Sequence, residues 1–262
     1  MIDDRAPSAA LSARLWETHA GWWQDQFTNG VDPEYTEQIL PLIAELLAGS
    51  AAPAADSTGS GPGIVLDVGT GEGQVARYLT EQGHDVVGVD PVVAQVAEAH
   101  RRGGGPRYLL APAHQLPVAD ASCRAAVACL VYEHIDDVDA AIAETARVLR
   151  PGGLFVLLLN HPLLQTPGSG WIDDQMIDPP EQYWRIGPYL DESATVEEVQ
   201  KEVFIRFIHR PLSRYVNALV EHGLTVDRMV EPSPPPGFLA QAPWYEAAGT
   251  IPRLLALRCR KA

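Results

Sequence analysis

Cysteine and long apolar runs are both scarce in this chain of 262 residues. Its three cysteines, Cys123, Cys129 and Cys259, are an odd number without the spacing of a metal motif, which favours buried, reduced thiols. The purely apolar run of residues 154–159 is too short to span a bilayer. The chain does not start with a basic segment followed by an apolar one, so we expect no secretory leader. These absences predict a soluble, cytoplasmic protein without a membrane partner.

Basic residues are also few. The chain has 19 Lys and Arg against 34 Asp and Glu, a formal net charge of −15, so it should repel polyanions and nucleic acid is not an expected partner. Asp136, Asp137 and Asp139 form an acidic cluster, but they open a predicted helix, whose N-terminal dipole stabilises carboxylates. We therefore predict no metal site and a small molecule as the binding partner. Nothing in the sequence indicates an oligomeric state.

Composition divides the chain into four segments. Residues 1–62 are a predicted N-terminal helical appendage that ends in a linker of small residues, Pro and Gly. Residues 63–160 alternate short apolar runs with helical periods and form the predicted core. Residues 161–210, crowded with Pro, Gly and aromatics, are a predicted cap insertion. Residues 211–262 are predicted to add a helix and the closing strands of the same domain.

Hydrophobic periodicity predicts the fold class. The apolar runs of the core are nearly continuous, as in strands that helices cover on both faces. Helical periods separate these runs and predict helices over residues 74–81, 91–101 and 136–150, with a further helix over 212–221. This alternation predicts an α/β, Rossmann-like sheet of seven mostly parallel strands. In the appendage, Asp32-Pro33-Glu34 is typical of a helix start, with Asp as the N-cap.

A glycine-rich turn follows the first predicted strand. The segment VLDVGTGEG places Gly69, Gly71 and Gly73 where missing Cβ atoms let a ligand approach the backbone. Gln74 stands where a dinucleotide fingerprint has its last glycine, so the turn reads G-x-G-x-G rather than G-x-G-x-x-G. Asp90 ends the next apolar run, where a carboxylate can accept both hydroxyls of a ribose. The pattern predicts a nucleoside site.

These motifs resemble the class I S-adenosylmethionine-dependent methyltransferases, in particular a small-molecule branch similar to the ubiquinone and menaquinone biosynthesis enzymes. The resemblance covers residues 64–160 and runs in order through VLDVGTGEG, VVGVD, APAHQLPV, CLVYEHIDD and ARVLRPGG. It implies S-adenosyl-L-methionine as cofactor and S-adenosyl-L-homocysteine as product. The residues expected to contact the cofactor are Asp67, Gly69, Gly71, Gly73, Asp90, Pro91, Ala113, His114, Leu130 and, from the appendage, Trp23.

The resemblance also implies roles for single residues. Asp67 is expected to orient the methionine amino group, Asp90 to bind the ribose hydroxyls, and Ala113 with His114 to edge the adenine. One position departs from the family pattern, because Pro112 stands where an Asp usually accepts from the adenine amino group. A backbone carbonyl, His114, a neighbouring side chain or water must then accept that bond.

Histidines are the candidate bases, because methyl transfer to a hydroxyl requires removal of its proton. His134 follows the fourth predicted strand and His161 the fifth, so both are expected near the carboxyl edge of the sheet, and we predict these two as catalytic. The residues expected to face the substrate are Tyr132, Trp171, Tyr183, Trp184 and His209. The aromatic appendage is expected to close over the cofactor.

Two alternatives remain open at this stage. An NAD(P)-dependent oxidoreductase shares the βαβ unit and the ribose-binding acid, although the cap and the missing last glycine argue against it. A protein that binds S-adenosylmethionine without catalysis would keep the cofactor motifs and transfer no methyl group. The sequence does not identify the acceptor or whether O, N or C is methylated.

Overall fold

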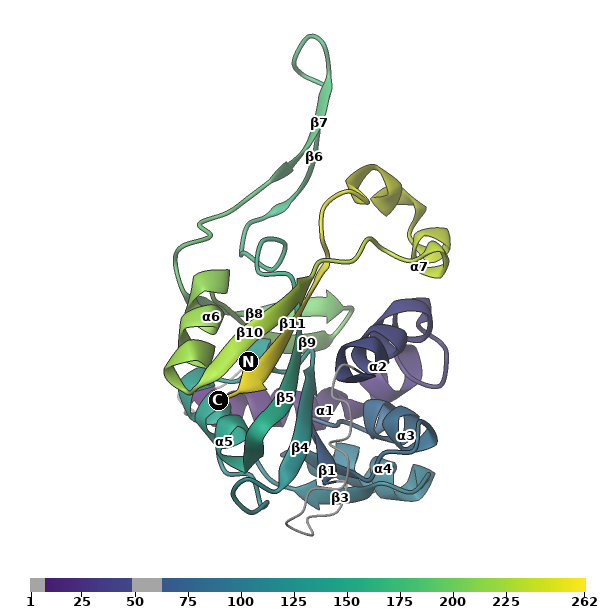
Figure 1. Cartoon of the computed structure of the whole chain (residues 1–262). Helices are drawn as coiled ribbons and strands as arrows, with labels where there is room; N and C mark the ends of the chain where they lie inside the picture. The colour runs from purple at the N-terminus through teal and green to yellow at the C-terminus, as the bar shows by residue number, and fades with distance from the viewer. Residues whose placement is uncertain (1–7, 49–62) are drawn as a thin grey trace.

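The computed structural model describes residues 8–48 and 63–262, so the predicted linker, apart from Gly63, lies outside the described residues. A seven-stranded sheet forms the centre of the molecule (Figure 1). Its strands are β1 (Ile64–Val68), β2 (Val86–Asp90), β3 (Arg107–Leu110), β4 (Cys123–Cys129), β5 (Leu149–Asn160), β10 (Leu224–Val230) and β11 (Leu254–Lys261). Their spatial order is β10-β11-β5-β4-β1-β2-β3, and only β11 runs antiparallel to its neighbours, so the predicted Rossmann-like sheet is confirmed.

Helices cover both faces of this sheet. The helical elements are α1 (Ser8–Gln26), η1 (Tyr35–Ile39), α2 (Leu40–Ala48), α3 (Gln74–Glu81), α4 (Val93–Arg102), η2 (Tyr132–His134), α5 (Val138–Val148), α6 (Leu212–Glu221), α7 (Pro236–Gln241) and η3 (Pro243–Ala248). The predicted bounds of α3 and α6 are matched, whereas α5 is shorter at both ends than expected. Asp137 caps α5 by accepting from the Ala140 amide, and strand geometry already begins at Leu149.

Alternation along the strands separates two hydrophobic clusters. In β5, Phe155, Leu157 and Leu159 pack with α5 and α6, while Leu154, Val156 and Leu158 face α2, α3 and α4. This follows from the two-residue period of a strand, and it explains why the sequence of β5 is apolar throughout. No helix among the described residues is long and apolar enough to cross a membrane.

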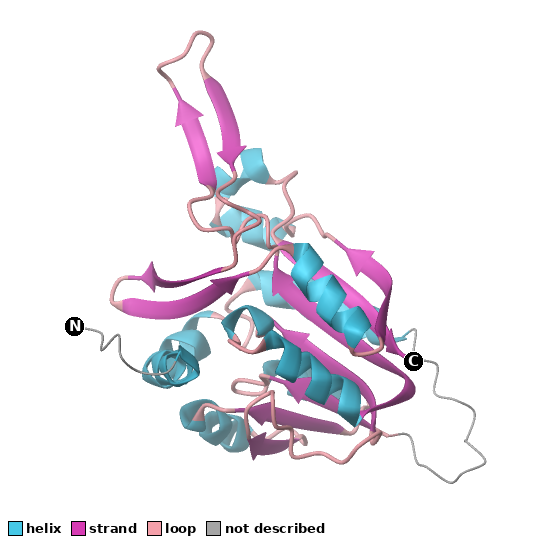
Figure 2. Cartoon of the chain, turned by 90° about the vertical axis from the view of Figure 1, so that its left-hand side faces the viewer, coloured by secondary structure: helices cyan, strands magenta, loops and turns pink. Residues whose placement is uncertain are grey.

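The predicted cap insertion contains two hairpins. Strands β6 (Gly170–Asp174) and β7 (Glu181–Arg185) form a hairpin that projects away from the central sheet (Figures 1 and 2). Strands β8 (Ser193–Gln200) and β9 (Val203–His209) form the second hairpin, which packs against α1 through β9. The N-terminal helix and the second hairpin therefore meet over one edge of the sheet.

Helix starts in the appendage follow the expected capping chemistry. The Asp32 carboxylate accepts a hydrogen bond from the Glu34 amide at 2.8 Å, and helical geometry begins at Pro33. The predicted N-cap is therefore confirmed. The polar turn before it is anchored to the core, because the Gln74 side chain accepts from the Asn29 amide and donates to the Phe27 carbonyl.

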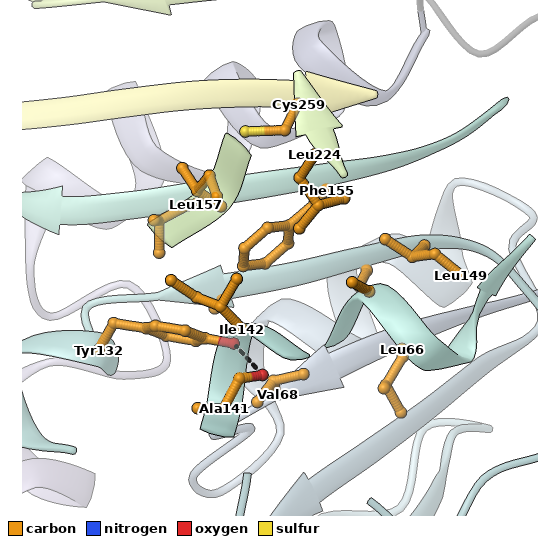
Figure 3. Packing of buried hydrophobic residues seen from close by; sticks show 14 of the residues in the cluster. Leu66, Val68, Tyr132, Ala141, Ile142, Leu149, Phe155, Leu157, Leu224 and Cys259 are labelled. Atoms are coloured by element: carbon orange, nitrogen blue, oxygen red, sulfur yellow. Dashed lines mark hydrogen bonds between the residues drawn. The ribbon is translucent and has the colours of Figure 1, made fainter. Parts of the chain in front are cut away.

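Tyr132 lies inside the cluster between the sheet and α5 (Figure 3). Its side chain is fully buried, and its hydroxyl is hydrogen-bonded to Thr145 Oγ1 at 2.7 Å and to the Ala141 carbonyl at 3.2 Å. We expect Tyr132→Phe to lower the free energy of unfolding by about 1 kcal/mol, because those bonds are lost while the ring is kept. Urea unfolding measures this.

The control for that variant is Tyr183→Phe on the projecting hairpin, where the tyrosine is 43% exposed. This change should leave the unfolding midpoint where it is. An equal loss of stability in both variants would contradict a core role that is specific to Tyr132.

Candidate functional site

A cavity of about 390 Å³ opens at the carboxyl ends of β1, β2 and β4. The order of the sheet reverses between β1 and β4, and ligands of open α/β sheets bind outside the strand ends at such a point. Among the residues that the sequence predicted to contact the cofactor, those that line the cavity are Trp23, Asp67, Gly69, Gly71, Asp90, Pro91, Ala113, His114 and Leu130.

The glycine turn forms one wall of the cavity. Gly71 has φ +55, and the atom nearest to a Cβ placed there would be Trp23 Nε1 at 3.8 Å, so the backbone is open toward the appendage. Gly73 does not line the cavity. It caps α3 with φ +89, and a Cβ there would lie 2.4 Å from the Tyr108 hydroxyl oxygen. Packing against Tyr108 therefore explains the glycine at position 73.

Two buried carboxylates face this wall. Asp67 is 1% exposed and accepts a hydrogen bond from the Thr70 hydroxyl at 2.6 Å. Asp90 is 7% exposed and accepts from the Gly71 and Val92 amides, each at 2.9 Å. Burial raises the pKa of Asp67 to about 7 and that of Asp90 to about 6.

These carboxylates also test whether the cavity suits the cofactor that the motifs imply. Within the described part of the chain, neither Asp67 nor Asp90 forms an ion pair with a basic side chain. Buried carboxylates are costly unless they are paired or hydrogen-bonded. Each carboxylate oxygen can accept a further hydrogen bond, and a ligand with an ammonium group and a ribose diol offers such donors, so the residues present fit S-adenosylmethionine.

The loop after β3, which the sequence predicts to edge the adenine, forms another wall of the cavity. Pro112, Ala113 and His114 line it, and the Pro112 carbonyl already accepts from the Gln115 amide at 3.1 Å. Leu130 also lines the cavity and has the rare backbone angle φ +56. Such strain in a residue other than glycine is typical of functional sites, where the surrounding structure holds the conformation.

Helix α1 supplies a wall that the sequence predicted only in outline. Trp16 and Trp23 line the cavity from this helix, and their rings meet edge to face at 5.6 Å. Trp23 also stacks on Phe27 at 4.6 Å. The helix is anchored near its middle by Glu17, whose carboxylate accepts from the Ala94 amide at the start of α4. The appendage thus lies against the cavity as expected.

His134 lines the same cavity from the turn after β4. Its ring lies between Trp16, at 5.1 Å, and Phe207 of β9, at 4.8 Å. Its Nδ1 lies 2.8 Å from the Arg206 carbonyl oxygen. A carbonyl can only accept, so Nδ1 carries the proton and Nε2 is the ring nitrogen with a free lone pair. Burial lowers the pKa of His134 to about 4, which keeps the ring neutral.

Of the seven residues predicted for catalysis or substrate binding, six do not line the cavity. Tyr132 is enclosed in the core, and His161 Nε2 is hydrogen-bonded to Glu231 Oε1 at 2.8 Å, outside the cavity lining. His209 Nε2 donates to the Tyr189 carbonyl under the cap. The cavity lining also excludes the hairpin aromatics Trp171, Tyr183 and Trp184. The structure thus places Tyr132, His161, His209 and these three aromatics away from the cavity that holds the cofactor residues.

Four residues near the cavity escaped the sequence-based reasoning. Ser12 and Trp16 come from a helix with little amphipathic signal, and Asp136 was assigned only to a helix start. Arg206 looked like one polar residue in an apolar strand, yet it is 7% exposed and its guanidinium pairs with Asp136 at 2.7 Å. A lone basic residue at a buried strand position was the available signal.

Comparison with known proteins agrees with this geometry. A family profile described as "Methyltransferase domain" matches residues 66–157. A malonyl-[acyl-carrier protein] O-methyltransferase of Serratia marcescens is 34% identical over 108 residues, which are 41% of this chain and 42% of that protein. The chain thus matches the curated relative over about two fifths of its length.

Solved structures show the same fold. An S-adenosylmethionine-dependent methyltransferase from Mesorhizobium loti superposes with a TM-score of 0.69 at 24% identity, covering 83% of this chain and 96% of that one. A geranyl diphosphate C-methyltransferase from Streptomyces coelicolor, in complex with S-adenosyl-L-homocysteine, gives 0.63 at 13% identity, covering 98% and 100%. Residues 66–157 thus match a methyltransferase domain, and the chain has the fold of solved S-adenosylmethionine-dependent methyltransferases.

The raised pKa of Asp67 predicts how cofactor affinity depends on pH. Because the ionised carboxylate binds an ammonium group, S-adenosylhomocysteine affinity should rise as the pH passes upward through about 7. The stability of the unliganded protein should change in the opposite sense. A raised pKa gives a contribution that is full below the ordinary value of 3.8 and is lost as the pH rises through about 7.

Calorimetric titrations at several pH values measure the affinity. Asp67→Asn should bind more weakly and should lose most of the pH dependence, while circular dichroism confirms the fold. A slope that is the same in wild type and variant would show that another group titrates.

The position of Trp23 gives a matched pair of variants on α1. Trp23 lines the cavity, whereas Trp22 does not and donates its indole N–H to Gln200 at 2.7 Å. Trp23→Ala should weaken S-adenosylhomocysteine binding by about tenfold, because an apolar wall is lost. Trp22→Ala should leave the affinity within about twofold. Equal affinities in the two variants would assign both rings to packing.

Proposed function

We propose that this protein transfers the methyl group of S-adenosylmethionine to a hydroxyl or amine of a small molecule, with His134 as proton acceptor. The observation that carries the proposal is the neutral imidazole of His134 on the cavity wall, with Nδ1 donating to Arg206 and Nε2 free to accept. When bound, the sulfonium cofactor supplies an activated methyl group. The protein then has to align the acceptor and exclude water.

A base with a low pKa is suited to this reaction. An alcohol becomes strongly acidic as its oxygen gains the methyl group, so a weak base within reach takes the proton during the transfer. A neutral imidazole also avoids placing a second positive charge beside the sulfonium. Burial among Trp16 and Phe207 keeps His134 in that state.

The polar residues near His134 suit a methyl acceptor that carries a hydroxyl or an amine. Asp137 lines the cavity close to His134, and Ser12 lines it from α1, where its hydroxyl donates to the His134 carbonyl at 3.0 Å. Carboxylates accept hydrogen bonds from O–H and N–H groups. The walls around them are largely aromatic and aliphatic, so an acceptor with an apolar body and a polar end fits best.

The oxidoreductase alternative has less support. The Gln74 side chain holds the Asn29 amide and the Phe27 carbonyl at the position where a dinucleotide fingerprint has its last glycine. The match to the methyltransferase domain also favours methyl transfer. A non-catalytic binder of S-adenosylmethionine is the other outcome that the following experiment detects.

The test is a screen with methyl-labelled S-adenosylmethionine. The purified protein is incubated with the donor and with matched sets of small molecules that carry a hydroxyl, an amine or neither on the same apolar body. Label should enter the hydroxyl or amine members only. Cofactor binding without transfer to any member would indicate a binding protein, and transfer to carbon would overturn the proposed acceptor class.

Substitution of His134 and of His161 tests which of the two predicted bases takes the proton. With an acceptor from the screen, His134→Ala should lower kcat by about 10² to 10⁴ with nearly unchanged cofactor affinity. His161→Ala should keep kcat within a few-fold, because its imidazole binds Glu231 outside the cavity. The reverse pattern would move the base to His161, and no effect from either would indicate an acceptor that needs no base.

A further inference from the structure

The turn that carries His134 is held by two buried arginines from one segment of the cap. Arg206 lies on β9, and Arg210 follows that strand directly. Their side chains are 9% and 3% exposed. The guanidinium of Arg210 donates to the Tyr132, Ile135 and Asp136 carbonyls, at 3.3, 2.7 and 2.8 Å. Arg210 therefore fixes the backbone of the turn.

Arg206 holds the same turn at two other points. Its carbonyl accepts from His134 Nδ1 at 2.8 Å, and its guanidinium contacts Asp136 Oδ1 at 2.7 Å, two residues further along the turn. The next residue of β9, Phe207, places its ring against the imidazole. Strand β9 thus sets the direction of His134 Nδ1, the packing of its ring and the position of the Asp136 carboxylate.

The Arg206–Asp136 pair is poorly built as a stabilising interaction. Arg206 Nη1 and Asp136 Oδ2 are buried and have no hydrogen-bond partner in the described part of the chain. Removing charges from water costs more than such a pair returns unless all their hydrogen-bonding positions are satisfied. A role in orientation accounts better for the pair than a role in stability.

We propose that the Arg206–Asp136 ion pair is a positioning device for His134, which keeps Nδ1 protonated toward β9 and Nε2 available to the acceptor. The use of Nε2 as a base rests on the proposed function. The ion pair and the tautomer that it favours are properties of the free protein. Both members act through the imidazole and are positioning residues.

The charges that face His134 make the proposal testable. Arg206 from β9 and Asp136 from the turn are the charged groups, while α1 contributes Ser12 and Trp16, which carry no charge. The positive charge of Arg206 disfavours a protonated ring. We expect the carboxylate of Asp136 to offset part of this effect. Removing one member should therefore affect His134 differently from removing the other.

The experiment is nuclear magnetic resonance of the full chain with ¹⁵N-labelled histidine, with His134→Gln used to identify the His134 signals. Wild type should show the neutral Nδ1–H tautomer throughout about pH 5.5 to 8. Arg206→Met should raise the titration midpoint of His134 by about one pH unit, because the repelling charge is lost and Asp136 is left unpaired. Arg206→Lys should restore the wild-type behaviour.

Asp136→Asn distinguishes positioning from mere loosening of the turn. This variant keeps the arginine charge, so His134 should stay neutral as in wild type, whereas loosening would raise its midpoint in both variants. Arg214→Met, which removes the Arg214–Asp139 pair away from this turn, should leave the His134 signals unchanged. Thermal unfolding checks that both of these variants keep the folded structure.

Three results would overturn the proposal: an Nε2–H tautomer in wild type, an unchanged midpoint in Arg206→Met, or an upward shift in both Arg206→Met and Asp136→Asn. If Arg206→Met does not fold, the comparison of Arg206→Lys with Asp136→Asn still decides between charge and loosening. Calorimetry with S-adenosylhomocysteine on the same samples reports separately on the proposed function. If calorimetry detects no binding of S-adenosylhomocysteine, the tautomer result still holds.

Discussion

The hydrogen bond from the Gly71 amide to the Asp90 carboxylate is the interaction on which the site depends. It joins the turn after β1 to the end of β2, and the other oxygen of Asp90 accepts from the Val92 amide at the start of the next loop. One side chain thereby fixes two loops whose backbones face the cavity. Because the sheet is parallel here, these loops meet at the same edge, and the turn after β4 joins them there.

The sequence predicted most of this edge because its signals are local. Glycine spacing, an acid at a strand end and apolar runs with a period of two or 3.6 residues each depend on neighbouring residues. Asp67, Gly69, Gly71 and Asp90 therefore lie where the motifs suggested. Gly73 shows the limit of this reasoning, because its lack of a side chain makes room for Tyr108, which is distant in the sequence.

Side-chain direction was the part that the sequence could not supply. Tyr132 and His134 are two residues apart in a short 3-10 turn, where each residue rotates the side chain by about a third of a turn. One ring is consequently buried against Thr145 and the other lines the cavity. His161 follows β5 at the same edge, but a hydrogen bond to Glu231 directs it elsewhere. The hairpin aromatics depend in the same way on non-local pairing.

The N-terminal helix and the cap converge on a single turn. Ser12 Oγ donates to the His134 carbonyl, while β9 contacts its imidazole from the other side. Helix α1 thus completes a cavity whose floor the central core provides, and β9 supports His134 on the cavity wall. The family match, confined to residues 66–157, therefore leaves out Ser12, Trp16 and Trp23, which line the cavity from α1.

The central claim is that the cavity binds the cofactor of a methyltransferase. The most direct measurement is a pair of calorimetric titrations of the purified chain at one pH, with S-adenosylhomocysteine and with NADH. The account predicts saturable binding of S-adenosylhomocysteine, at one site per chain, and no measurable heat of binding with NADH. Saturable binding of NADH without binding of S-adenosylhomocysteine would contradict it.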